Sequence, residues 1–154
     1  MIITDSEFSR QIMLPAKKIL DELGMECEMS IVSSHRTSKL MRKFICDAEK
    51  KGCKIFICAA KMAAYLASAV AFVTTYPVIE VPLTSDHSPL MELSSLFSTV
   101  KLPSGIPIAT MPIDGAENAA WFVAQMLAMS DSKPTNVQNQ IFVVEEVRQE
   151  LANT

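Results

Sequence analysis

The residues best suited to chemistry form the segment Ser33-Ser34-His35-Arg36-Thr37, where an apolar run ends and a helical pattern begins. The His35 imidazole can transfer a proton near neutral pH. The Ser33 hydroxyl and the Arg36 guanidinium can together hold an anion such as a phosphate. We therefore interpret this junction as a candidate acid/base site with an anion anchor. The alternative is that Ser34 or Thr37 caps the helix and His35 is an ordinary loop residue.

The elements that position this segment are expected to be alternating strands and helices. Residues 54–60 form a continuous apolar run, as in a strand that helices cover on both faces of a parallel sheet. The apolar stripe from Ile12 to Leu23, closed by Gly24, is typical of an amphipathic helix. We predict strands over residues 1–3, 27–33, 54–60, 77–83 and 106–113, and helices over 12–23, 40–48, 62–73, 90–100, 116–129 and 136–151. Because parallel strands need crossover connections, this order predicts a doubly wound α/β sandwich with five parallel strands.

Length, composition and charge narrow the function classes. A chain of 154 residues has single-domain length, and its 49% apolar and 20% charged residues are typical of a globular protein. A net charge of -3 without a basic run argues against a nucleic-acid surface. Neither a leader nor an apolar run of about 18 residues is present, which argues against a membrane segment. We expect a cytoplasmic protein whose partner is a small molecule or another protein.

The cysteines and glycines argue against a zinc site and against a glycine-rich phosphate-binding loop. The four cysteines form no CxxC pair and lie in apolar segments, so we interpret them as reduced core residues rather than zinc ligands. They are Cys27, Cys46, Cys53 and Cys58. The four glycines, at positions 24, 52, 105 and 115, lie at helix ends and turns, which leaves none for a phosphate-binding loop. A phosphate would therefore be held by hydroxyls, helix N-termini and Arg36.

Two of the predicted helices, residues 62–73 and 116–129, are apolar nearly all the way round. A sheet covers only one side of a helix, so something else must cover the other. The C-terminal helix is one possibility. We favour burial against other subunits, and hence a homo-oligomer.

Four segments in this order resemble the carboxyaminoimidazole ribonucleotide mutase family of purine biosynthesis, whose animal relatives are aminoimidazole ribonucleotide carboxylases. They are "SSHRTS", "TTYPVIEVPL", "LPSGIPIATM" and "ENAAWFVAQMLAMSD". The resemblance implies a flavodoxin-like three-layer αβα sandwich, an octamer with active sites at subunit junctions, and no metal or organic cofactor. It runs from about residue 4 to residue 131. We expect a mutase/carboxylase-like α/β domain over residues 1–131, followed over residues 132–154 by a polar hinge and a C-terminal helix that packs on the same domain or a neighbouring subunit.

The resemblance also implies a reaction and its residues. The family moves a carboxyl group from the exocyclic nitrogen to carbon 4 of an aminoimidazole ribonucleotide, through carbon dioxide held in a closed pocket. His35 falls on the family's catalytic histidine, and Arg36 falls on the residue expected to hold the phosphate. The remaining substrate-binding candidates are Ser6, Ser9, Ser33, Ala60, Lys61, Tyr65 and Leu66.

Two loops depart from the family pattern. The family's Gly-Ser-x-Ser-Asp loop falls on residues 5–9, where Asp5 and Glu7 put carboxylates near the expected phosphate, an unfavourable arrangement. Its Gly-Ala-Gly-Gly-Ala-Ala-His-Leu loop falls on residues 59–66, where the glycines are gone, Lys61 takes the place of one of them and Tyr65 replaces the histidine.

These departures leave three hypotheses. The chain is a divergent mutase or carboxylase, in which Lys61 replaces lost phosphate contacts and Tyr65 or His87 assists. Alternatively, it is a catalytically inactive or re-purposed member, an oligomeric scaffold or a ligand-binding regulator. A changed substrate is the third possibility, because Lys61 could bind a carboxylate where the family has a glycine; otherwise Lys61 is a solvated residue at a helix start.

Overall fold

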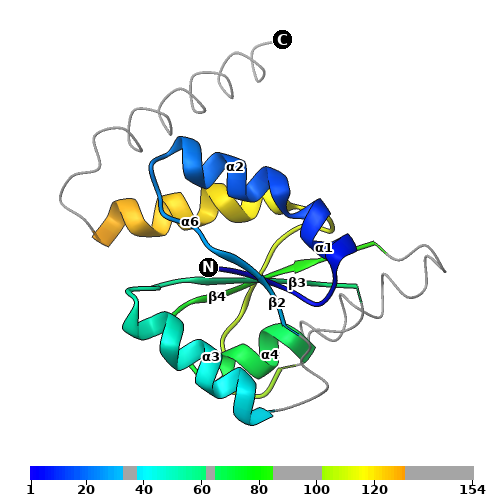
Figure 1. Ribbon diagram of the computed structural model, residues 1–154, viewed down its shortest axis with the longest axis vertical. Coiled ribbons are helices and arrows are strands. Elements are labelled where there is room, and N and C mark those ends of the chain that lie inside the picture. Colours follow the sequence, from blue (N-terminus) through cyan, green and yellow to red (C-terminus); the bar gives the residue numbers. More distant parts are fainter. Residues whose placement is uncertain (33–37, 62–64, 85–101, 131–154) are drawn as a thin grey trace.

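The computed structural model describes residues 1–32, 38–61, 65–84 and 102–130, and these form one five-stranded parallel sheet with helices on both faces (Figure 1). The strands are β1 (Ile2–Thr4), β2 (Met29–Ile31), β3 (Phe56–Ala60), β4 (Val78–Pro82) and β5 (Ala109–Thr110). Their order in the sheet is β2-β1-β3-β4-β5, and every neighbouring pair is parallel. The predicted flavodoxin-like α/β sandwich is confirmed.

The helices lie in two layers, with α2 and α6 over one face of the sheet and α3 and α4 over the other (Figure 1). Their bounds are α1 (Glu7–Ile12), α2 (Leu14–Glu22), α3 (Ser38–Lys50), α4 (Tyr65–Ala71) and α6 (Ala116–Ser130). Across the described ranges, none of these helices has the length and apolar character that a membrane crossing needs. The helices predicted over residues 90–100 and 136–151 lie outside the described residues.

The core forms on both faces of the central strand. All five residues of β3 are buried, as the continuous apolar run predicts. Ile57 and Ala59 face the layer of α2 and α6, whereas Phe56, Cys58 and Ala60 face the layer of α3 and α4. Alternate side chains of this strand thus belong to two separate core clusters.

One predicted helix is divided and one predicted strand is short. The segment 12–23 belongs to two helices, α1 and α2, with a break at Met13. Pro15 lies in the first turn of α2 and has no N–H with which to extend the hydrogen bonds of α1. The strand predicted over residues 106–113 is reduced to β5, because Pro107 and Pro112 flank it and cannot donate to a ladder.

Candidate functional site

The order of the strands reverses beside β1. From β1 the chain passes to β2 on one side and then to β3 on the other. In open parallel sheets ligands bind beyond the carboxyl ends of the strands at such a reversal. Thr4, the last residue of β1, pairs with Ala59 of β3, so the segments that follow these strands start side by side. The candidate site therefore lies at the carboxyl ends of β1 and β3, where Asp5 and Lys61 directly follow the strands.

The Asp5 carboxylate connects these two segments. Its Oδ1 accepts hydrogen bonds from Ser6 Oγ at 3.0 Å and from Ser9 Oγ at 2.5 Å. Its Oδ2 accepts the backbone N–H of Lys61 at 3.4 Å. The Ser6 hydroxyl also caps α1, since it accepts the backbone N–H of Ser9 at 3.3 Å. Asp5 is thus an internal anion that protein donors already surround.

Lys61 brings a positive charge to the same edge. Its Nζ lies 3.3 Å from the centre of the Phe8 ring, a cation–π contact between the end of β3 and helix α1. Phe8 is 44% exposed, and Lys61 is partly buried. The two residues place a cationic side chain beside Asp5.

The other described candidates differ in accessibility. Ser9 is fully buried, Leu66 is 2% exposed and Ala60 is 8% exposed, which gives these three side chains a place in the packing of the domain. Tyr65 begins α4 and is 53% exposed. Contact of any of these residues with a substrate stays a prediction, and the geometry favours it most for Lys61 and Tyr65.

The catalytic candidates His35, Ser33 and Arg36 lie outside the described residues, and so does His87. The flanks of the first segment are described. The N–H of Val32 donates to the carbonyl oxygen of Thr4 at 2.8 Å, and α3 begins at Ser38. Val32, the last described residue before this segment, therefore lies at the end of β1, at the same edge of the sheet as Asp5.

Two buried polar residues were not foreseen. Glu80 in β4 is 3% exposed and pairs in register with Cys58 of β3. Burial, and secondly the charge of Glu80, raise the pKa of the Cys58 thiol, which keeps it protonated. Thr4 is fully buried, and its hydroxyl has no hydrogen-bond partner among the described residues. A charged residue inside the apolar run "PVIEVPL" was the only signal for Glu80.

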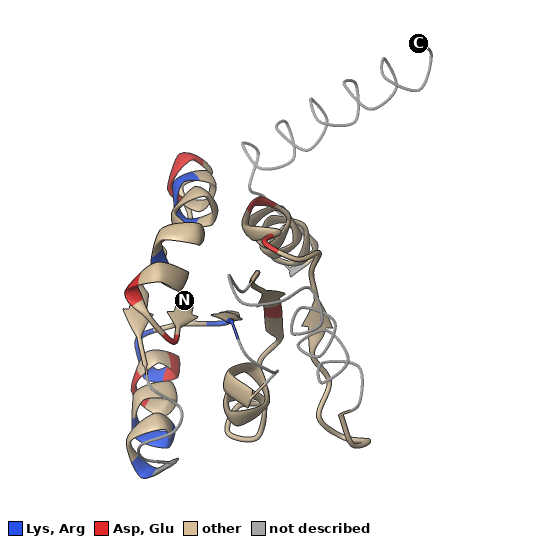
Figure 2. Cartoon of the chain, turned by 90° about the vertical axis from the view of Figure 1, so that its right-hand side faces the viewer, with Lys and Arg blue, Asp and Glu red and all other residues tan. Residues whose placement is uncertain are grey.

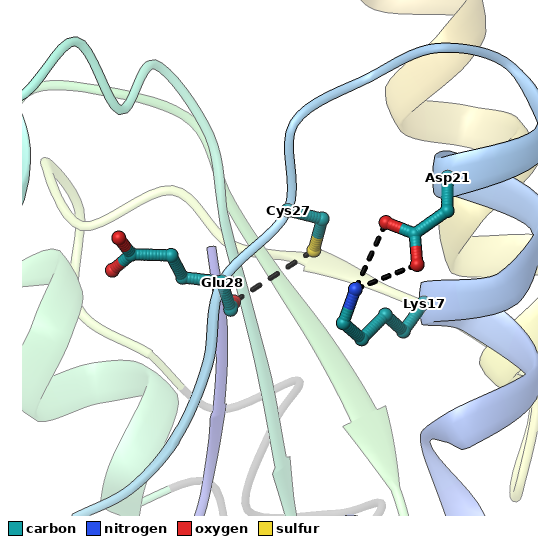
Figure 3. A network of polar contacts seen from close by, with 4 residues as sticks. All are labelled: Lys17, Asp21, Cys27 and Glu28. Atoms are coloured by element: carbon teal, nitrogen blue, oxygen red, sulfur yellow. Dashed lines mark hydrogen bonds and ion pairs between the residues drawn. The ribbon is translucent and has the colours of Figure 1, made fainter.

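A second polar cluster lies at the opposite end of the strands, beside the start of β2 (Figure 3). The Lys17 ammonium donates to both carboxylate oxygens of Asp21, at 2.9 and 2.6 Å, and the Cys27 thiol lies 3.7 Å from the carbonyl oxygen of Glu28. The hydrogen bond that Lys17 donates to Asp21 raises the pKa of Lys17, and burial raises the pKa of Cys27. A cavity of about 470 Å³ borders Cys27 and Glu28. Over the residues that the structure describes, no three His, Cys, Asp or Glu side chains group as metal ligands would.

Comparison with known proteins identifies the family. The model of the AIR carboxylase family matches residues 1–150. The chain belongs to the AIR carboxylase family. Among its AIR carboxylase relatives, the N5-carboxyaminoimidazole ribonucleotide mutase of Thermotoga maritima is 41% identical over 128 residues, which are 83% of this chain and 74% of that protein. The mutase of Saccharolobus solfataricus is 39% identical, over 83% of this chain and 80% of that protein.

The AIR carboxylase family also includes larger fungal proteins. The phosphoribosylaminoimidazole carboxylase of Candida albicans is 39% identical over 90% of this chain, which corresponds to 24% of that protein. Among solved structures, the crystal structure of Treponema denticola PurE superposes with a TM-score of 0.83 and 20% identity, over 98% of this chain and 91% of that one. The likeness to this structure supports the fold described above, and the resemblance of the sequence motifs to the family is confirmed.

Proposed function

We propose that this protein transfers a carboxyl group to the imidazole ring of an aminoimidazole ribonucleotide in purine biosynthesis, as a mutase or a carboxylase. The observation that carries the proposal is the family match over residues 1–150, together with relatives of about 40% identity that bear both enzyme names. The position of Asp5 and Lys61 at the strand reversal supports it, since ligands of such sheets bind there. The alternative of a non-catalytic scaffold finds no support among these relatives.

In this proposal His35 performs the proton transfers. It protonates the departing ribotide nitrogen as the carboxyl group leaves, and it later removes the proton from the ring carbon that receives the group. Arg36 and Ser33 hold the phosphate, and the closed pocket keeps the released carbon dioxide next to the ring. These roles rest on the resemblance of "SSHRTS" to the family motif. No metal or organic cofactor is required, so treatment with a chelator is expected to leave turnover unchanged.

We also propose a homo-oligomer, and specifically an octamer. Helix α4 carries no charged residue, and α6 carries only Glu117, whereas charge gathers on α2 and α3 (Figure 2). Large apolar side chains on or beside these two helices remain uncovered in the single chain: Tyr65, Phe72 and Met129 are 53%, 62% and 89% exposed. Exposed apolar groups of this size favour contact with further subunits. We place this assembly in the cytoplasm.

The experiment that tests the function follows conversion of carboxyaminoimidazole ribonucleotide by the purified protein. The proposal expects turnover by the natural chain and by Lys50→Met, which changes an exposed side chain at the far end of α3. His35→Asn is expected to lose at least a hundredfold in rate, the usual contribution of a general acid/base being roughly 10²–10⁴-fold. Absence of turnover, together with no thermal shift from the ribotide, would contradict the proposal. Turnover that survives His35→Asn would remove only the role of His35.

A further inference from the structure

A cluster of cationic side chains lies on the first half of α3 (Figure 2). Arg42 and Lys43 follow Lys39 by three and four residues, so the three side chains share one face of the helix. All three are exposed, and no acidic residue occurs in α3 before Asp47. We call these three residues the basic patch. The first half of α3 thus presents positive charge, and no negative charge, to solvent.

The basic patch lacks the ion pairs that the other helical cations make. Each other cationic residue in the described helices pairs with a carboxylate one helical turn away: Arg10 with Glu7, Lys17 with Asp21, Lys18 with Glu22 and Lys50 with Asp47. Within the described ranges, no ion pair involves a residue of the basic patch. Cations near the start of a helix also oppose its macrodipole. Neither local pairing nor helix stability therefore accounts for this arrangement.

The direction of α3 places the basic patch at the carboxyl ends of the strands. The last turn of α3 lies beside the start of β3, because the backbone N–H of Cys53 donates to the carbonyl oxygen of Ala48 at 3.0 Å. Met41 and Ile45 pack on the same face of the sheet as Phe56. A helix of 13 residues is about 20 Å long, and a strand of five residues spans roughly 17 Å. The start of α3 is therefore level with the end of β3, where the candidate site lies.

An anionic ligand needs local positive charge to approach this protein. The chain carries a net charge of -3, which repels anions at long range. The ribotide of the proposed reaction has a phosphate of nearly two negative charges, and its carboxylated form has one more. Exposed cations beside a site raise the local concentration of such a ligand, and they do so without touching it. The basic patch has the sign and the location for this role.

We propose that Lys39, Arg42 and Lys43 attract the anionic ribotide electrostatically to the candidate site, without contacting it in the bound state. The inference rests on the proposed function and deepens it. Attraction of this kind raises the rate of encounter, and hence kcat/KM, while kcat stays unchanged. Salt weakens it, since the screening length falls from about 30 Å at 0.01 M to about 8 Å at 0.15 M.

The experiment compares two variants that lose the same number of positive charges at opposite ends of α3. Conversion of carboxyaminoimidazole ribonucleotide is followed at about 10 mM and at about 0.5 M salt, between which the screening length falls severalfold. Glutamine removes the charge and is nearly as good a helix former as lysine or arginine. The test variant combines Lys39→Gln, Arg42→Gln and Lys43→Gln. The matched control changes three exposed residues at and just beyond the other end of the helix: Lys50→Gln, Lys51→Gln and Lys54→Gln.

The test variant is expected to have about fivefold lower kcat/KM than the natural protein at low salt, and a value within about twofold of it at high salt. Its kcat should be unchanged, and the control should stay within about twofold at both salt concentrations. If thermal unfolding shows that the triple variant does not fold, Arg42→Gln with Lys43→Gln replaces it, with an expected loss of about threefold.

Three results would overturn the role of the basic patch while the proposed function stands. Equal low-salt losses in the test variant and the control would show that net charge alone matters. A loss that persists at high salt would indicate direct contact with the bound ribotide. A smaller mass by light scattering for the test variant alone would make the patch a subunit contact. Natural protein without turnover would overturn the proposed function and this inference with it.

Discussion

The Ser9 hydroxyl donates to Asp5 Oδ1 at 2.5 Å, and Ser9 is fully buried where α1 starts. This hydrogen bond joins Asp5, the first residue after β1, to Ser9 in the first turn of α1. The carboxylate that the sequence places near an expected phosphate site is held by Ser6, Ser9 and the N–H of Lys61. The hydroxyls of Ser6 and Ser9 consequently contribute to the architecture of the loop after β1.

The Ser9–Asp5 hydrogen bond is expected to stabilise the fold measurably. Ser9→Ala should lower the free energy of unfolding by roughly 1.5–3 kcal/mol, because a hydrogen bond to a charged group is lost at a buried position. Urea denaturation measures the loss. In an Asp5→Asn background the same change should cost less, since the charge that strengthens the bond is gone. Equal losses in both backgrounds would mean that the two residues are not coupled.

Much of the fold follows from local sequence patterns. The apolar run 54–60 predicts the buried central strand, and alternation of strands with helical stripes predicts the parallel sheet. The break at Met13 escaped prediction because the apolar stripe continues through it, although Pro15 was the available signal. Strand β5 was predicted too long, since its apolar composition outweighed the two prolines that flank it.

The site was less predictable, because its contacts join distant segments. Asp5 and Ser9 are only four residues apart, so a contact between them can be expected from the sequence. The hydrogen bond from Lys61 to Asp5 spans 56 residues and exists only because β1 and β3 are neighbours in the sheet. The stacking of Lys61 on Phe8 depends on the same pairing. Side-chain partners of this kind require the tertiary structure.

Gly115 is expected to tolerate no side chain. A Cβ at this position would lie 2.8 Å from the carbonyl oxygen of Pro112. Gly115→Ala should lower the free energy of unfolding by about 1–3 kcal/mol, as overpacking does. Gly52→Ala is the comparison, because Gly52 has open space but a φ of 97°, so its expected cost of about 1 kcal/mol is conformational. A loss at Gly115 no larger than that at Gly52 would contradict the steric explanation.

Phe72 is expected to contribute to assembly. It is 62% exposed just after α4, a helix without charged residues. Light scattering should give a mass well above the 17.0 kDa of one chain, and Phe72→Asp should shift it towards smaller species because a charge would be buried at the subunit contact. Phe72→Leu keeps an apolar side chain and should keep the assembly. A natural chain that is a stable monomer would contradict the oligomer.

Stability is expected to fall at alkaline pH because of buried thiols. Burial raises the pKa of Cys27, and burial followed by the charge of Glu80 raises the pKa of Cys58. In the unfolded chain thiols titrate near about 8.5, so above that pH the unfolded state has released protons that the native state still binds. Stability is therefore complete below about pH 8.5 and declines as pH rises, by up to about 1.4 kcal/mol per pH unit for each such thiol.

Urea denaturation between about pH 8 and 10 measures this decline, a range that ends below the usual pKa of lysine. Cys58→Ala is expected to have a lower free energy of unfolding at every pH, because it leaves a cavity beside Glu80. Its free energy of unfolding should nevertheless fall less steeply with pH, because the variant lacks the contribution of the Cys58 thiol. The slope rather than the absolute stability is the quantity to compare. Identical slopes for the natural chain and Cys58→Ala would show that the Cys58 thiol does not keep its proton in the folded protein.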